Sequence, residues 1–115
     1  MPKRADNKRV KTAIDPRRLK EMPEEATVDA YGESEQISGW SCMLDEHLAV
    51  PFETVVLGAA VTVEKLDLRD DDQIVAICKR GRTRQAIEIR ELPLPTPEPA
   101  GAEWIDAYRH WRKGW

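Results

Sequence analysis

The periodicity of the apolar residues changes at Pro51, and this change constrains the fold more than any other feature of the chain. Before it, apolar side chains recur at spacings of three and four over residues 33–48, which places them on one face of an amphipathic helix: Ile37, Trp40, Met43, Leu44 and Leu48. Pro51 ends that pattern, because a proline disfavours helical backbone at the residue before it. Beyond Pro51, short apolar stretches rich in β-branched residues indicate strands. The sequence therefore predicts a helix followed by a sheet.

Four apolar stretches follow Pro51 with no helical pattern between them. They cover residues 52–57, 61–68, 73–79 and 84–90, and a turn at Lys79-Arg80-Gly81-Arg82 joins the last two. Short strands that follow one another without helices between them are typical of antiparallel sheets. We predict an α+β fold in which a small, SH3-like, curled antiparallel sheet or barrel is flanked by an N-terminal and a C-terminal helix.

The C-terminal part contains a proline-rich connector and a second helical pattern. Prolines at every second position of residues 93–99 cannot continue a sheet, so we expect an extended connector there. Residues 101–113 regain helical spacing and place four large side chains on one face: Trp104, Ile105, Tyr108 and Trp111. We expect this face to dock on the sheet, and stacking on a ligand is the alternative.

The first 22 residues differ in composition from the rest of the chain. Residues 1–22 carry eight basic and three acidic side chains with few large apolar ones, so we expect a disordered basic arm, followed by a single domain over residues 23–115. No apolar run suits a secretory signal or a membrane span, and we expect a cytoplasmic protein. Cys42 and Cys78 fit no metal-ligand spacing and are expected to be small buried thiols.

Acidic side chains are concentrated in the middle of the chain. Residues 23–72 hold 13 acidic and only two basic residues. Such a high density of negative charge favours binding of a cation or of a basic partner. The acids gather at three places: the start of the predicted helix (Glu33, Glu35), its end (Asp45, Glu46) and the turn between the second and third strands (Asp67, Asp70, Asp71, Asp72). Carboxylate oxygens suit calcium, although no EF-hand glycine is present and acidic turns are often simply solvated.

Other chemistries find little support in the sequence. His47 and His110 are the only histidines, and neither lies in a zinc-ligand spacing; we expect surface or boundary positions for both. Phosphate-binding and nucleotide-binding glycine patterns and nucleophile motifs are missing, so we expect no enzyme. The basic arm and the basic hairpin at residues 79–84 keep nucleic-acid binding as an alternative function. Against it, residues 23–115 carry 18 acids and 10 bases, a charge that repels phosphate. An acidic module that binds a basic protein partner is the other alternative.

A block of residues resembles a known family. Its parts are Asp29-Ala-Tyr-Gly, Glu35-Gln36, Gly39-Trp40, Leu44-Asp45-Glu46-His47-Leu48 and Pro51-Phe52. Together they resemble the CcbP-type calcium-binding family, small soluble proteins of cyanobacteria and other bacteria. The resemblance covers roughly residues 25–112 and is weaker over the strands and the last helix. This chain departs from the family pattern at Ser41-Cys42-Met43 and in its long basic arm.

The resemblance implies calcium as the ligand, bound at an acidic surface rather than in an EF-hand. It also implies a buffering or signalling role without catalysis, and we expect a monomer without a membrane partner. The acids that it carries over are Glu35, Asp45 and Glu46. Asp29 also matches, but it precedes the helix and could equally be a capping or turn residue. The turn acids Asp70, Asp71 and Asp72 match only the family's habit of an acidic turn between strands. These six acids, without Asp29, are the expected metal ligands.

Overall fold

The sheet is a four-stranded antiparallel meander. In the computed structural model, which describes residues 16–114, its strands are β1 (Phe52–Val56), β2 (Ala59–Leu68), β3 (Ile74–Arg80) and β4 (Thr83–Glu88). Each strand pairs with the next one along the chain, so β1 and β4 form the two edges of this sheet. The predicted α+β class and the four strands are confirmed, while the SH3-like curl of the sheet stays a prediction.

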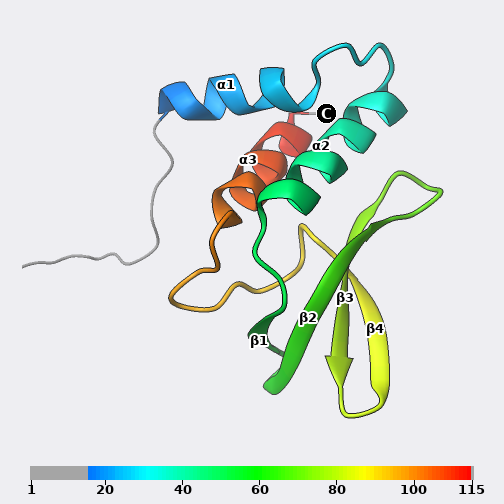
Figure 1. Cartoon of the computed structure of the whole chain (residues 1–115), viewed down its shortest axis with the longest axis vertical. Helices are drawn as coiled ribbons and strands as arrows, with labels where there is room; N and C mark the ends of the chain where they lie inside the picture. Colours follow the sequence, from blue (N-terminus) through cyan, green and yellow to red (C-terminus); the bar gives the residue numbers. More distant parts are fainter. Residues whose placement is uncertain (1–15, 115) are drawn as a thin grey trace, which may run out of the picture.

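Three helices of the described part gather on one side of this sheet (Figure 1). They are α1 (Pro16–Ala26), α2 (Glu33–His47) and α3 (Ala102–Lys113). α2 packs on β2, and the three helices pack against one another. The core lies between these layers, where Met22, Trp40 and Tyr108 are completely buried. None of the helices among residues 16–114 is both long enough and apolar enough to span a bilayer.

Helix α1 corrects the predicted boundary of the basic arm. Residues 16–22, which were expected to be disordered, form the first part of this helix. The reason is a short apolar stripe: Met22 and Ala26 are buried and Leu19 packs against the core. In addition, the guanidinium of Arg18 lies 5.6 Å from the ring centre of Trp104 and pairs with Glu25. The prediction for residues 1–15 lies outside the described residues.

The aromatic face of α3 packs against the aromatic side chain of α2. Helix α3 packs on α1 and α2, and it is α2 that covers β2. The ring of Trp40 in α2 lies 6.1 Å from that of Trp104, 5.6 Å from that of Tyr108 and 5.5 Å from that of Trp111. The first two pairs are edge-to-face and the third is tilted. Aromatic pairs bury large areas and fix the rings relative to one another. The aromatic stripe is therefore part of the core, as expected, and its rings join α3 to α2.

The two cysteines are free and lie in different environments. Cys78 is buried in β3, as predicted. Cys42 is exposed, which corrects the prediction of a buried thiol. Cys42 is two residues, or about half a helical turn, from both Trp40 and Leu44, which face the core. Its side chain therefore lies on the opposite side of α2.

Candidate metal centre

The β2–β3 turn presents the acids Asp70, Asp71 and Asp72 at the end of a tight hairpin. The N–H of Arg69 donates to the carbonyl of Gln73 (2.9 Å), and the N–H of Asp72 donates to the carbonyl of Arg69 (3.0 Å). Asp72 has a φ of 63°, in the left-handed region. A turn followed by one left-handed residue is a common three-residue hairpin loop, and aspartate tolerates that conformation better than most residues. The predicted acidic turn is thus confirmed for these three acids, whereas Asp67, which was also expected there, lies in β2.

A hydrogen bond connects this turn to the beginning of α2. The hydroxyl of Ser34 donates to the carboxylate of Asp72 at 3.0 Å, across 38 positions of the sequence. Ser34 lies in the first helical turn together with Glu33 and Glu35, which are exposed. The carboxylate of Glu35 also accepts the backbone N–H of Tyr31 at 2.9 Å. Two acidic segments far apart in the sequence therefore lie next to each other, at the helix end whose dipole favours negative charge.

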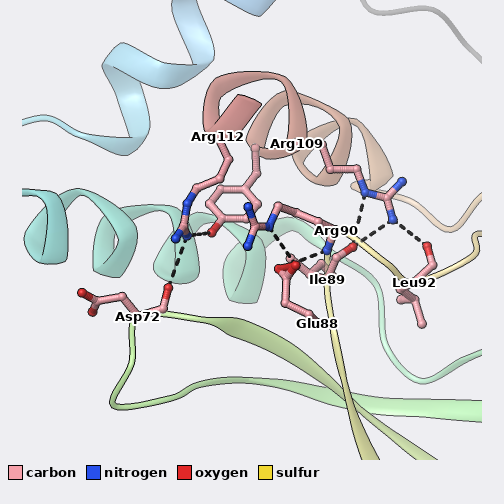
Figure 2. Close-up of polar contacts among 8 residues, drawn as sticks. Asp72, Glu88, Ile89, Arg90, Leu92, Arg109 and Arg112 are labelled. Atoms are coloured by element: carbon pink, nitrogen blue, oxygen red, sulfur yellow. Dashed lines mark hydrogen bonds and ion pairs between the residues drawn. The ribbon is translucent and has the colours of Figure 1, made fainter. Parts of the chain in front are cut away.

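Arg112 of α3 holds the same turn from the other side. Its guanidinium donates to the backbone carbonyl of Asp72 (3.3 Å) and to the hydroxyl of Tyr108 (2.5 Å). Figure 2 shows the carboxylate of Asp72 pointing away from this guanidinium. Burial raises the pKa of the Tyr108 phenol, and the charge of Arg112 opposes that rise. Arg112 thus fixes the turn through its backbone and leaves the side-chain oxygens of Asp72 for other partners. Sequence reasoning missed this residue.

A second arginine secures α3 to the chain that leaves β4. The guanidinium of Arg109 donates to the carbonyls of Ile89 (2.9 Å) and Leu92 (2.5 Å), as Figure 2 shows. Beside it, Arg90 pairs with Glu88 at 2.7 Å. Charged donors to backbone carbonyls form comparatively strong hydrogen bonds. These contacts fix the position of α3, and with it that of Arg112.

A second group of acids lies where α2 crosses β2. Asp45 in α2 is exposed as a residue, but partial burial raises the pKa of its carboxyl group, and the nearby negative charge of Asp67 in β2 raises it further. Asp67 also lies 3.8 Å from the guanidinium of Arg69. Glu46 follows Asp45 and is exposed at the end of α2. Asp67 is therefore the neighbour of Asp45, a pairing that sequence spacing could not reveal.

The six expected ligands are thus divided between two places. Asp70, Asp71 and Asp72 lie by the beginning of α2, which carries Glu35, whereas Asp45 and Glu46 lie at its other end. Among residues 16–114, no three acidic, histidine or cysteine side chains converge closely enough to hold a metal ion. His47 is exposed and stacks on Trp104 at 4.9 Å between ring centres; His110 is exposed on α3. The oxygen donors suit a hard cation such as calcium, and binding requires them to move together.

Replacing Asp45 with Asn is expected to stabilise the fold at neutral pH. The folded-state pKa of Asp45 is raised, so its ionised form opposes folding, and this cost appears as the pH rises through that pKa. Below the ordinary aspartate pKa of about 3.9 the carboxyl is protonated in both states, and the two proteins should unfold alike. Thermal unfolding of both proteins at pH 7 and pH 3 measures this. An equal gain in melting temperature at both pH values would contradict it.

Comparison with known proteins supplies the functional context. A family model described as calcium binding, Calci_bind_CcbP, matches residues 20–112 of the 115-residue chain. No curated protein and no solved structure matched the chain. The matched region begins inside α1, so it includes the buried Met22 and runs through the acidic turn to Arg112 in α3. The chain therefore belongs to the CcbP family of calcium-binding proteins.

Proposed function

We propose that the chain binds calcium on the surface formed by α2 and the β2–β3 turn, and that it acts as a calcium buffer or signalling protein. The proposed ligands form two groups that one ion cannot span: Glu35 with the turn acids at the beginning of α2, and two acids at its other end. They are Glu35, Asp70, Asp71 and Asp72 in the first group, and Asp45 and Glu46 in the second. The observation that carries the proposal is the Ser34–Asp72 hydrogen bond, because it brings the acidic turn to the beginning of α2. The second support is the raised pKa of Asp45 beside Asp67.

Relief of like-charge repulsion is the physical basis of this binding. Two carboxylates about 4 Å apart repel each other by roughly 4 kcal/mol at an effective dielectric near 20. A divalent ion between them removes that cost and supplies attraction instead. Since no three acids are already gathered among the described residues, the ion must draw the turn and the helix together. Affinity should therefore lie in the weaker range of protein calcium sites, micromolar or weaker.

Calorimetric titration with calcium at physiological salt tests the proposed binding. We expect saturable binding, together with NMR shift changes at the amides of residues 33–36 and 69–73. Binding stabilises the state that binds, so calcium should also raise the melting temperature. An absence of saturable binding at millimolar calcium, or an equal response to magnesium, would overturn the proposal.

Three matched triple variants separate the contribution of the acids in the β2–β3 turn from that of the acids on α2. Asp70, Asp71 and Asp72 are replaced by Asn in the first variant. Glu35, Asp45 and Glu46 are replaced by their amides in the second. The control replaces the exposed acids Glu53, Glu91 and Glu103 by Gln, which removes the same formal charge elsewhere. We expect the first two variants to lose about tenfold or more in affinity and the control to stay close to wild type, allowing for weak long-range charge effects. Equal losses of affinity in all three variants would show that calcium responds only to the net charge of the protein.

A further inference from the structure

A groove lies at the end of the sheet away from the acidic turn. It encloses about 700 Å³ and its lining includes Val56, Leu57, Val61, Cys78, Arg80 and Ile87. The antiparallel order places the β1–β2 and β3–β4 turns at one end of the sheet and the β2–β3 turn at the other, as Figure 1 shows. The groove borders the first two turns, so it is separate from the proposed calcium-binding surface.

The floor of the groove continues the core-facing side of the sheet. Side chains two positions apart on a strand share a face. Val63, Ala76 and Ile89 are buried in the core, and Val61, Cys78 and Ile87 lie two positions from them towards the open end. The apolar inner face of the sheet therefore continues to the edge of the core, where Cys78 is buried but Val61 and Ile87 are only partly covered. Contiguous apolar surface of this kind marks interaction sites in soluble proteins.

Leu57 lies at the rim of the groove, where its exposed side chain adds no packing to the fold. Its relative exposure is 102%, and its φ is 50°. Leu57 and Gly58 form the two-residue turn between β1 and β2, a turn type that favours Asn-Gly because both positions need positive φ. A leucine in this conformation is strained, because its Cβ atom lies too close to the following carbonyl oxygen. A strained and exposed apolar side chain at the rim of an apolar groove is suited to contact with a partner.

The charges around the groove define the chemistry of the occupant. Arg80 lines it, Arg82 is exposed in the adjoining turn, and the lining contains no acidic residue. Arg84 is already paired with Glu64 at 2.8 Å, whereas no partner is found for Arg80 or Arg82 among residues 16–114. We propose that this groove binds a peptide segment of a partner protein in which apolar side chains alternate with carboxylates. The apolar side chains fill the groove, and the carboxylates meet the two arginines.

Selection from a library of displayed random peptides tests the proposal. The full chain is the bait, and binders to the Leu57→Asn, Arg80→Glu double variant are removed. We expect the enriched peptides to alternate Asp or Glu with Leu, Ile, Val or Phe. Titration of one such synthetic peptide should shift the amide signals of residues 56–61 and 78–87, in calcium and in chelator alike. Failure to enrich, or enrichment of peptides without acids, would overturn the proposal.

Single variants separate binding from folding. Leu57→Asn should leave the melting temperature unchanged or raise it, because asparagine suits the turn, and should weaken peptide binding about tenfold or more. Arg80→Gln should weaken it through the lost charge. The controls are Val55→Asn on the exposed side of β1 and Lys113→Gln on α3, which should bind normally. Unchanged affinity in Leu57→Asn and Arg80→Gln would refute the site. Sedimentation that shows the wild type self-associating through Leu57 would instead assign the groove to a second copy.

Discussion

Replacement of Gly101 by alanine is expected to lower the free energy of unfolding by about 3 kcal/mol or more. Gly101 precedes α3 and has a φ of 88°. A Cβ atom there would lie 2.0 Å from the carbonyl oxygen of His47 and 2.7 Å from the Cα of Leu48. Both atoms belong to the backbone, which cannot rotate out of the way as a side chain can. The end of α2 and the start of α3 would have to separate, breaking the 2.8 Å hydrogen bond between Ala49 and Ala100.

Gly58→Ala is the matched control for this variant. Gly58 has a φ of 80°, but a Cβ added there meets no atom within 4 Å. It therefore reports only the cost of the left-handed conformation, roughly 1–2 kcal/mol. Urea unfolding followed by circular dichroism compares the two proteins, and the difference between them is the cost of the close approach. Equal losses would show that α2 and α3 do not meet at Gly101 as described.

Truncation of Trp40 to alanine is expected to cost about 3–5 kcal/mol, the range for large core aromatic residues. Trp40 is completely buried and contacts the rings of Trp104, Tyr108 and Trp111. Since these contacts join α2 to α3, their loss loosens the helix that carries Glu35 and Asp45. Calcium affinity should therefore fall together with stability. Urea unfolding and calcium titration of the same variant measure the two effects.

Trp40→Phe distinguishes packing from the polar group of the indole. Among residues 16–114, no hydrogen-bond acceptor is found for the buried N–H of Trp40. A buried N–H without an acceptor costs free energy, so its removal should offset part of the lost volume. We expect this variant to lose clearly less stability than Trp40→Ala and to keep calcium binding. A loss as large as that of Trp40→Ala would show that the N–H makes a stabilising contact.

The elements that the sequence predicted well are those with a clear period. Residues 33–47 form a helix and four strands follow, because each buries one face whose apolar spacing is visible in the chain itself. Helix α1 was missed because its apolar stripe is short, comprising Leu19, Met22 and Ala26 among charged residues of both signs. That helix is stabilised by burial against α2 and α3, which local spacing does not reveal. Pro16 at its first position was an available signal of a helix start, and so was the Asp-Pro pair that it forms with Asp15 in the sequence.

The candidate site was also predictable from the sequence only in part. Composition identified Asp70, Asp71, Asp72 and Glu35 as acids in a turn and a first helical turn, and the residue types suggested calcium. It could not show that Ser34 bonds to Asp72 or that Asp67 acts on Asp45, because these contacts depend on how α2 lies across β2. It also could not show Arg112 holding the turn from α3.

The sequence alone determined the secondary structure after residue 33, the acidic character of the middle and the family. These properties follow from neighbouring residues and from side-chain chemistry, which need no knowledge of distant contacts. Only the tertiary structure decided which acids lie together, which helix covers the sheet, and which apolar residues remain uncovered beside Leu57 and Arg80. Such properties arise from packing between segments far apart in the chain, where geometry rather than local preference sets which groups meet.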